Sequence, residues 1–381
     1  MSINIAPKDI RNPNLRVDGA GGLAPARVVT IDLRLWKASG IGRYLNVLVP
    51  ALVATFPACR FHLLGPLDLL SDIAWPANVT LHDFNPPIYS IAEQLEAPGC
   101  IPADSELLWW PHYNVPLLYR GRLVVTVYDA YHLRMNGTLG DFVKRHYAAL
   151  FFALIRRRAE KVFTISNFSK NEVVALARVP SERIVPIHLG VSSEWFETSK
   201  EVGFSPRPYL LFVGNVKPHK NLRALVNAFA SLVDDIPHDL VIVGKREGFI
   251  TGDREVARMA KKLGDRVAFT GWVSDQDLRR LVANAGLMIF PSLYEGFGLP
   301  PLEAMACGCP VIASDIPVLR EVCSDKVRYF DPESVDDLRD AIISEILHPR
   351  NVSGIVDWVR RYDWGSCVEA AMEEFAPMLA K

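Results

Sequence analysis

Short apolar runs alternate with stretches of helical character from residue 28 onward. Several runs are near-continuous Val, Ile and Leu, which is typical of parallel strands buried on both faces. Strand–helix alternation favours doubly wound α/β sheets with right-handed crossovers. The predicted strands are 28–32, 61–65, 79–84, 107–110, 124–129 and 162–166 in a first series, and 209–214, 240–244, 267–272, 287–292 and 310–314 in a second. The predicted helices include 41–55, 142–160, 220–234, 275–285 and 334–348.

The two series are separated by residues 190–209, which are rich in Ser, Gly, Pro and charge and show no strand or helix signal. This segment is interpreted as an interdomain linker. The chain is therefore predicted to form two α/β domains of similar size that face a cleft. The predicted parts are a flexible arm at 1–26, a first domain at 27–198, a second domain at 199–365 and a C-terminal helix at 366–381.

Composition narrows the class of protein. Half of the 381 residues are apolar and 22% are charged, which excludes a disordered or fibrous chain. The 42 Lys and Arg nearly balance the 43 Asp and Glu, so bulk charge gives no argument for binding to nucleic acid.

The compartment is predicted from the cysteines and the apolar runs. Six cysteines without a Cys-x-x-Cys pair fit a reducing cytoplasm. We read no secretion signal, and the longest apolar run, 147–155, is far short of the about 20 residues of a bilayer span. A soluble or peripheral protein is expected.

Ligands of open parallel sheets bind at the carboxyl ends of strands, so the loops there are candidates for chemistry. The loop after 209–214 reads NVKPHKNL and carries Lys217 and Lys220, with Asn221 placed to cap the next helix. Two cations beside a helix N-terminus suit a pyrophosphate, whose departure develops negative charge. The alternative, that this is a solvated basic loop without a ligand, is given equal weight.

The loop after 287–292 reads LYEGFGLPPLEAMACGCPVIASD. Gly296 and Gly298 bracket an aromatic residue, and Glu295 and Glu303 lie before and within the helix that follows. Backbone N–H groups donate to hydroxyls and carboxylates accept from them, so this combination can hold a polyol such as a sugar or a ribose. The alternative is that Glu295 caps the helix and Glu303 is a surface residue; the full combination favours a site.

Three loops of the first series carry weaker signals. Gly40 and Gly42 open a helix and could bring backbone N–H groups to an anion, although a tight turn is the favoured explanation of a lone Gly-x-Gly. Asp129 and His132 follow the strand at 124–129, where a catalytic and a structural role are weighted evenly. Ser166, with Asn167, is expected to cap a helix rather than to bind a ligand.

The segment PSLYEGFGLPPLEAMACGCPVIASDIPVLREV, at 291–322, resembles the donor-site signature of family 4 retaining glycosyltransferases, in which seven residues separate two glutamates. The segments GIGRY, TISNFSKNEV, FVGNVKPHKNL and VAFTGWVSDQDL fall in the order of that family, so the resemblance covers most of 28–340. It implies the GT-B fold, in which two Rossmann-like domains flank a nucleotide-sugar cleft and the C-terminal helix crosses back to the first domain.

The resemblance also implies roles for residues. Glu295 would bind hydroxyls of the transferred sugar, Glu303 would bind the ribose, and Lys220 would neutralise the diphosphate. His132 would lie near the anomeric carbon and the acceptor. The catalytic set is therefore His132, Lys220 and Glu295; the donor-binding set is Gly40, Gly42, Asn215, Lys217, Val273, Gly296, Phe297, Gly298, Leu299 and Glu303; and Asp129 and Ser166 are acceptor-side candidates.

Two positions depart from the family pattern. Asn215 stands where many relatives carry Arg, and Lys217 is a candidate for the missing cation. Tyr128-Asp129 replaces the His-Asp of many relatives, which leaves open whether Asp129 or His132 takes the catalytic position.

The expected reaction is a front-face substitution without a metal or other cofactor. No Asp-x-Asp is placed as a metal clamp, and Lys220 can supply the electrostatic part. The resemblance favours GDP-mannose as the donor, and UDP-glucose or another UDP-sugar is the alternative. The resemblance also implies an acceptor that is a glycan or a polyprenyl-diphosphate-linked sugar in bacterial exopolysaccharide assembly. Two further classes of protein compete with this one, namely a GT-B-like epimerase or phosphorylase and a non-catalytic nucleotide-sugar binder.

A lipid-linked acceptor would bring the protein to the inner face of the cytoplasmic membrane. Residues 141–161 hold six Lys and Arg against two acids, together with Phe151 and Phe152. They do not form a clean amphipathic stripe, and a domain helix with a basic end is at least as good an explanation. Peripheral membrane contact is therefore a hypothesis.

Overall fold

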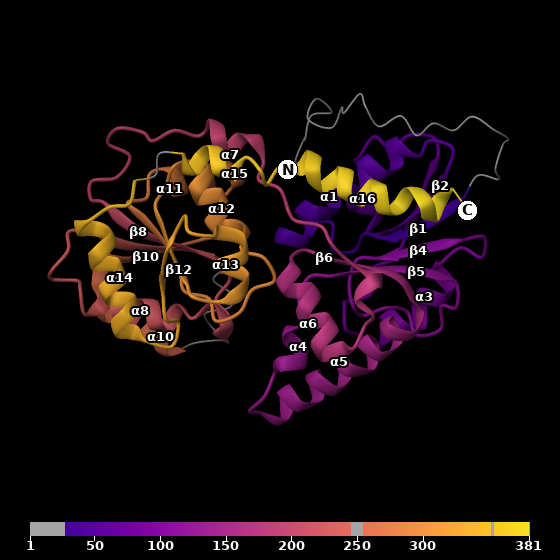
Figure 1. Ribbon diagram of the computed structural model, residues 1–381, viewed down its shortest axis with the longest axis horizontal. Coiled ribbons are helices and arrows are strands. Elements are labelled where there is room, and N and C mark those ends of the chain that lie inside the picture. The colour runs from indigo at the N-terminus through magenta and orange to yellow at the C-terminus, as the bar shows by residue number, and fades with distance from the viewer. Residues whose placement is uncertain (1–26, 245–253, 352–353, 381) are drawn as a thin grey trace. The chain divides into compact units, whose positions relative to one another are not determined.

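The computed structural model describes residues 27–244, 254–351 and 354–380, so the predicted flexible arm at 1–26 lies outside the described residues. The chain forms two compact units (Figure 1). The first runs to Gly190 and also includes the segment from Trp364, and the second is Val191–Asp363.

The first unit is built on a parallel sheet with the strand order β3-β2-β1-β4-β5-β6-β7. The strands are β1 Val28–Asp32, β2 Arg60–Gly65, β3 Val79–Asp83, β4 Leu107–Trp110, β5 Arg122–Val127, β6 Ala159–Thr164 and β7 Ile184–Pro186. The helices are α1 Ser39–Thr55, α2 Leu67–Leu70, α3 Ile91–Cys100, α4 Tyr131–Arg134, α5 Leu139–Arg158, α6 Asn167–Ala177, the 3-10 turn η2 Ser181–Arg183 and α16 Trp364–Leu379.

The second unit is built on a parallel sheet with the order β10-β9-β8-β11-β12-β13. The strands are β8 Tyr209–Val213, β9 Asp239–Val243, β10 Val267–Gly271, β11 Leu287–Phe290, β12 Val311–Ser314 and β13 Arg328–Phe330. The helices are α7 Ser193–Glu197, η3 Pro218–Lys220, α8 Leu222–Ala230, α10 Arg254–Lys262, η4 Gly264–Arg266, α11 Asp275–Ala283, α12 Leu299–Ala306, α13 Pro317–Cys323, α14 Val335–Leu347 and α15 Ile355–Val359.

Both strand orders are those of a doubly wound sheet that reverses direction at one point, between β1 and β4 in the first unit and between β8 and β11 in the second. This confirms the predicted α/β class with two Rossmann-like units. Every predicted strand overlaps an observed one. β7 and β13 are absent from the predicted set because each has only three residues, too few to show a strand pattern.

The predicted linker at 190–209 is wrong in one respect, because it contains the helix α7. Trp195 of this helix is buried, and the backbone N–H of Val191 donates to the carbonyl of Tyr362 at 2.7 Å. These contacts hold the start of the segment in the second unit, so that unit begins at Val191. A helix of five residues is too short for its periodicity to show in the sequence.

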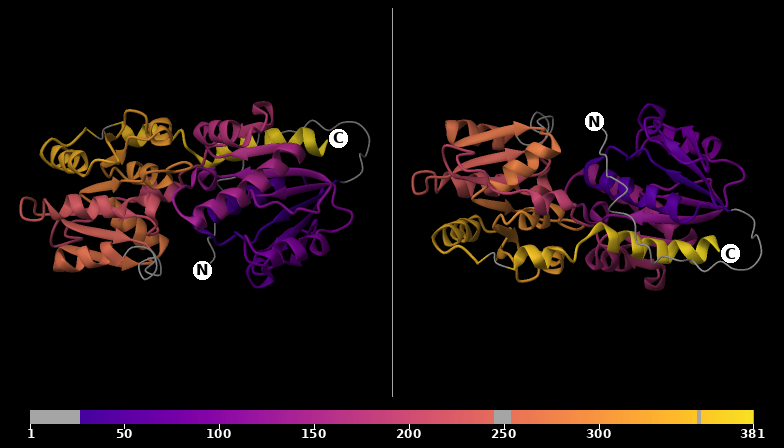
Figure 2. Two further views of the ribbon diagram at one scale, coloured as in Figure 1. Left: turned by 90° about the horizontal axis from the view of Figure 1, so that it is seen from below. Right: turned by 90° about the horizontal axis from the view of Figure 1, so that it is seen from above.

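The core of the first unit follows from the side-chain alternation of its central strands. Trp109 of β4 packs against Phe375 of α16, with ring centroids 5.2 Å apart, whereas Trp110 belongs to the opposite cluster with Phe151 and Phe152 of α5. Successive strand side chains point to opposite faces, so helices cover both faces of the sheet (Figure 2). The two phenylalanines considered for membrane contact are thus buried core residues, and that part of the hypothesis is wrong.

Further contacts fix α16 on the first unit. Lys161 of β6 forms an ion pair with Glu374 at 2.7 Å, and Arg122 donates to the carbonyl of Met378 at 3.0 Å. In the second unit, Leu222, Leu225, Val226 and Phe229 form the apolar stripe of α8 at helical spacing and pack in the core. Among the described helices, none is long and apolar enough to cross a bilayer.

Candidate active site

The site in the second unit forms where its sheet reverses direction. β8 and β11 are hydrogen-bonded neighbours, so the loops that leave their carboxyl ends start side by side. The backbone N–H of Leu293 donates to the carbonyl of His219 at 2.8 Å, which ties the two loops together. Lys220 ends the first loop and Glu295 lies in the second, so the fold brings these two predicted site residues together.

Lys220 and Glu295 form a direct ion pair. The Nζ atom lies 2.5 Å from Oε1 of Glu295, and the two side chains are only 19% and 13% exposed. The same Nζ lies 5.7 Å from the ring centroid of Phe290, at the end of β11, which is a cation–π distance. A partly buried pair is screened less than a surface pair, so both side chains are held in place. The alternative in which Glu295 caps the helix is wrong, because the N-cap residue of α12 is Gly298.

The loop then turns into α12 through Gly298. Gly298 is the N-cap residue of α12 and has φ 117°, a left-handed conformation that favours glycine. A Cβ atom at this position would meet the Leu319 side chain at 2.6 Å, so a larger residue would be strained in the backbone and would also force that side chain to shift. Phe297 is 3% exposed and packs edge-on against Tyr362, so its side chain belongs to the core and only its backbone can serve a ligand.

Glu303 lies inside α12 and is 5% exposed. The alternative of a surface glutamate is therefore wrong. A carboxylate is rarely buried unless a specific partner or function holds it there, so its placement in the helix that follows Gly298 supports a binding role. Leu299, the first residue of the helix, is also buried.

The neighbouring strand ends are joined through glycines. The N–H of Gly214 donates to the carbonyl of Val243 at 2.9 Å, and that of Gly244 donates to Gly271 at 3.1 Å. A Cβ at Gly244 would meet the Gly214 oxygen at 2.1 Å, so the backbones approach as closely as glycine allows. Among the predicted donor-binding residues near these ends, Asn215 and Lys217 are exposed and Val273 is half-buried.

The predicted helix cap at Asn221 is wrong. Asn221 takes the N-cap position of α8 with φ 56°, but its side chain makes no capping bond there. Its amide instead donates to the carbonyl of Pro332 at 2.8 Å, which anchors the Lys220 loop to the chain beyond β13.

In the first unit, the two glycines of the GIGRY segment have different surroundings. A Cβ at Gly42 would lie 2.5 Å from the carbonyl oxygen of Trp36, so a close backbone approach requires glycine there. Gly40 is exposed, and a Cβ there would meet nothing within 4 Å. The tight-turn interpretation therefore explains Gly42 and leaves Gly40 without a steric reason.

The acceptor-side candidates follow β5 and β6. His132 lies in α4, and its Nδ1 is 2.7 Å from the hydroxyl of Tyr113. Asp129 accepts the backbone N–H of Tyr131 at 2.9 Å, so its carboxylate shapes the turn that carries His132. Ser166 is fully buried and accepts the N–H of Ser169 at 2.9 Å, which confirms the capping interpretation.

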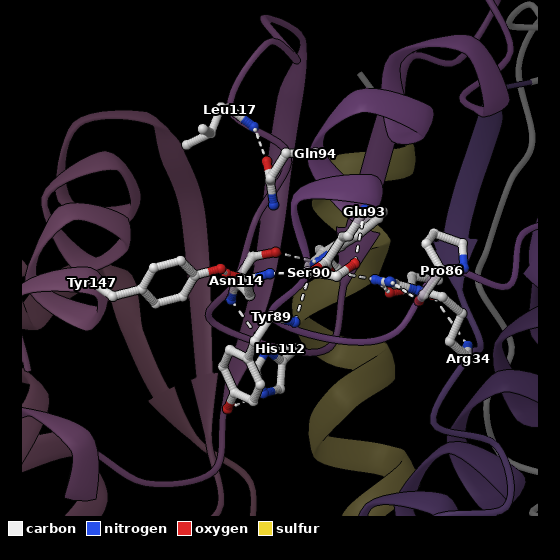
Figure 3. A network of polar contacts seen from close by, with 12 residues as sticks. Arg34, Pro86, Tyr89, Ser90, Glu93, Gln94, His112, Asn114, Leu117 and Tyr147 are labelled. Carbon is white, nitrogen blue, oxygen red and sulfur yellow. Dashed lines mark hydrogen bonds and ion pairs between the residues drawn. The ribbon is translucent and has the colours of Figure 1, made fainter. Parts of the chain in front are cut away.

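A buried polar network in the first unit, which sequence reasoning missed, lies beside these residues (Figure 3). Arg34 bonds to Asp32 at 2.6 Å and to Glu93 at 2.7 Å. Asn114 donates to Glu93 and accepts from the hydroxyl of Tyr147. Burial raises the pKa of the Glu93 carboxyl. For the Arg34 guanidinium, burial lowers the pKa, but the neighbouring carboxylates of Asp32 and Glu93 outweigh it, so the pKa of Arg34 is raised overall.

His112 joins this network to the His132 region. Its Nδ1 accepts the N–H of Asn114 at 3.1 Å, so the neutral ring carries its proton on Nε2, which lies 3.0 Å from the Tyr89 hydroxyl. Burial, Arg34 and His132 together lower the pKa of His112 to about 3. His112 and Tyr113 follow β4 closely, so inspection of the strand ends could have found them.

The low pKa of His112 predicts a specific acid sensitivity. A histidine with pKa 6.5 in the unfolded chain and about 3 in the fold contributes stability above pH 6.5 that is lost as the pH falls toward 3. Between pH 6 and pH 4 we expect wild type to lose about 2 to 3 kcal/mol more unfolding free energy than His112→Asn. Urea titrations monitored by tryptophan fluorescence measure this difference. Parallel pH dependences of the two proteins would contradict it.

Comparisons with known proteins match this chain to one family. The family described as "Glycosyl transferases group 1" matches residues 194–352. The O-antigen chain mannosyltransferase RfbU of Salmonella typhimurium is 30% identical over 261 residues, which are 68% of this chain and 70% of RfbU. The O-antigen chain mannosyltransferase B of Escherichia coli is 30% identical over 251 residues, which are 57% of this chain and 60% of that protein.

A solved structure extends the likeness to almost the whole chain. HepE of Anabaena in complex with UDP-glucose matches with a TM-score of 0.73 over 92% of this chain and 99% of HepE. The identity is 18%, so this likeness concerns the fold.

Proposed function

Since this chain belongs to the glycosyl transferases group 1 family and is a glycosyltransferase of the GT-B fold, we propose that it moves a mannosyl unit from GDP-mannose to a glycan acceptor. The relatives RfbU and mannosyltransferase B, both named for O-antigen chains, support mannose and bacterial polysaccharide assembly. The observation that carries the proposal is the Lys220–Glu295 pair at the reversal point of the second sheet, with buried Glu303 in the adjoining helix.

Lys220 serves the leaving group in this proposal. Breaking the bond between the anomeric carbon and the phosphate oxygen leaves negative charge on the diphosphate. A cation fixed near that oxygen stabilises the charge as it develops, and Lys220 is held in place by Glu295 and Phe290. Because a lysine supplies this charge, the proposed reaction has no metal or other cofactor.

Glu295 orients the sugar rather than attacking it. Its carboxylate accepts from hydroxyls of the mannosyl unit, and backbone N–H groups of the Gly296–Gly298 turn can donate to the same sugar. The acceptor hydroxyl then forms its bond to the anomeric carbon from the face that the diphosphate leaves. Its proton passes to a diphosphate oxygen, and the configuration of the sugar is retained.

The remaining predicted residues bind the rest of the donor or act on the acceptor side. Glu303 binds the ribose of the nucleotide, and Asn215, Lys217 and Val273 lie at the neighbouring strand ends where the phosphates and base would be held. His132 acts on the acceptor side, because its ring is positioned by Tyr113 while the Asp129 carboxylate is engaged with its own turn.

The donor is tested by ligand stabilisation. A ligand present at about one hundred times its Kd stabilises a protein by about 2.7 kcal/mol. We expect GDP to raise the unfolding temperature more than UDP or ADP, and GDP-mannose with EDTA present to add one hexose to a mannoside acceptor by mass spectrometry. Stabilisation by UDP alone would replace the donor with a UDP-sugar, and the absence of any nucleotide effect would contradict the function.

We also propose that the protein works in the cytoplasm at the membrane face, through the start of α5. Leu139, Phe142 and Val143 are 81%, 58% and 60% exposed, and Lys144 and Arg145 follow directly. Apolar side chains beside cations suit the surface of an anionic bilayer. All six cysteines are free thiols, which fits a reducing compartment.

Vesicle flotation tests this surface. We expect wild type to float with vesicles that contain anionic lipid at low salt and to be released at high salt. Phe142→Ser should weaken binding about tenfold, because an exposed aromatic side chain gains about 1 to 2 kcal/mol on entering the interface. Leu118→Ser, at a residue 64% exposed elsewhere on the same unit, is the matched control. Equal flotation of both variants would rule out this surface.

A further inference from the structure

Tyr89, in the loop between β3 and α3, has an unusual backbone conformation. Its φ is 67°, in the left-handed region that bulky residues rarely adopt. Such conformations persist only where the surroundings fix them, and they gather at functional sites. The strained residue here is an aromatic one, so its side chain is a candidate for function.

The surroundings that fix Tyr89 are the buried network of Figure 3. The backbone N–H of Tyr89 donates to Oε2 of Glu93 at 3.0 Å, and Ser90 caps α3 by accepting the N–H of Glu93 at 3.1 Å. Glu93 is fully buried and is held by Arg34 and Asn114. A buried carboxylate and guanidinium thus hold a surface loop in one conformation.

Tyr89 is the most exposed member of a group of aromatic residues that contact one another. Tyr89 is 44% exposed, whereas His112 and Tyr113 are 8% and 7% exposed. The Tyr89 ring centroid lies 5.0 Å from His112, 5.6 Å from Tyr113 and 5.7 Å from His132. Neutral His112 donates its Nε2 proton to the Tyr89 hydroxyl, which fixes the tilt of the ring. The Tyr147 ring lies 6.1 Å away as well. The network therefore holds a partly solvent-exposed tyrosine directly beside His132.

A pyranose ring suits the exposed part of such an aromatic side chain. The C–H groups of a sugar carry small positive partial charges, and the face of an aromatic ring is negative, so the two attract when stacked. Tyr89 follows β3, His112 and Tyr113 follow β4, and His132 follows β5, which places the group at the carboxyl edge where ligands of such sheets bind. The Lys220–Glu295 pair of the other unit engages the donor in the proposed reaction, which leaves the acceptor as the ligand for this surface.

We propose that Tyr89 is an acceptor-binding residue whose exposed ring stacks on the pyranose that receives the transferred sugar. This inference rests on the proposed function, because it assigns the acceptor of that reaction. It also explains why a charged network is buried beneath a surface loop, since the network holds the stacking ring beside His132.

Saturation-transfer NMR with methyl α-D-mannopyranoside, methyl α-D-glucopyranoside and methyl N-acetyl-α-D-glucosaminide tests the proposal. We expect at least one of these pyranosides to receive saturation on its ring C–H protons, and Tyr89→Leu to weaken its binding about five- to tenfold. Tyr89→Phe, which keeps the ring, should bind more tightly than Tyr89→Leu. Leu95→Ala removes a 75% exposed side chain from α3 and is the matched control, with wild-type binding expected.

Tyr89→Asn separates function from folding. Both variants lose the ring and its hydrogen bond with His112, but asparagine tolerates the left-handed conformation better than leucine. We therefore expect Tyr89→Asn to unfold at a higher temperature than Tyr89→Leu and to show the same loss of pyranoside binding. Wild-type pyranoside affinity in Tyr89→Leu and Tyr89→Asn, or no pyranoside binding by wild type, would overturn the proposal. So would a variant that loses GDP-mannose affinity instead of pyranoside affinity.

The same variants distinguish this inference from the proposed function. If GDP stabilises wild type and Tyr89→Asn equally while the pyranoside affinity is also equal, only the role of Tyr89 falls. If no nucleotide binds but pyranoside binding depends on Tyr89, the proposed donor reaction falls and the sugar-binding surface stands.

Discussion

Lys220→Ala is expected to lower kcat by about a thousandfold, which corresponds to about 4 kcal/mol of transition-state stabilisation. The substitution removes the cation that is fixed at the reversal point of the second sheet by Glu295 and Phe290. The effect should fall mainly on kcat, because the charge on the leaving diphosphate develops as the bond breaks. The change in kcat is measured from initial rates of GDP release at saturating GDP-mannose.

Two further variants make the result specific. Lys220→Arg keeps the charge but not the compact ammonium geometry, so we expect an intermediate rate. Lys326→Ala removes a lysine of the same unit that pairs with Asp325 at 2.9 Å on the surface, and it should behave as wild type. A Lys220→Ala enzyme within about threefold of the wild-type rate would remove Lys220 from the mechanism.

Glu295→Gln is expected to lower kcat/KM for GDP-mannose by about a hundredfold or more. The substitution keeps the shape of the side chain but removes the charge that accepts from sugar hydroxyls and that holds Lys220. Because Lys220 and Glu295 form one ion pair, each single variant already breaks it. The loss of transition-state stabilisation in the double variant Lys220→Ala/Glu295→Ala should therefore be smaller than the sum of the two single losses.

The matched control for Glu295 is Glu374→Gln. Glu374 also pairs with a lysine, Lys161, at 2.7 Å, but in the first unit between α16 and β6. Its loss should lower stability slightly and leave kcat/KM unchanged. Glu295→Gln with wild-type kcat/KM, or fully additive losses in the double variant, would contradict the role of the pair.

Local patterns in the sequence predicted the sheets well, for a physical reason. A strand buried on both faces must be apolar along its length, so strands such as Leu287–Phe290 stand out from any neighbouring segment. The ends of these strands then pointed to Lys220 and Glu295, because the topology of a doubly wound sheet fixes where such loops meet. Short elements anchored by a single side chain, such as α7 with Trp195, carry no pattern of this kind.

The buried network of the first unit could not be predicted in the same way. Arg34 and Glu93 are 59 residues apart and meet only because the loops after β1 and β3 converge. The conformation of Tyr89 depends on that meeting, and nothing in the local sequence requires a tyrosine to be left-handed. The sequence also did not predict which residues of α5 are exposed. Phe151 and Phe152 face the core, whereas Phe142, in an earlier turn, is exposed.

The central claim is that Lys220 holds the diphosphate and Glu295 holds the sugar of one donor. Calorimetric titration of GDP and of GDP-mannose into wild type, Lys220→Ala and Glu295→Gln tests it most directly. We predict that Lys220→Ala weakens both ligands, because both carry the diphosphate, but by much less than it lowers kcat. Glu295→Gln should weaken GDP-mannose by about tenfold and leave GDP nearly unchanged. Binding of GDP-mannose with wild-type affinity by both variants would contradict the claim.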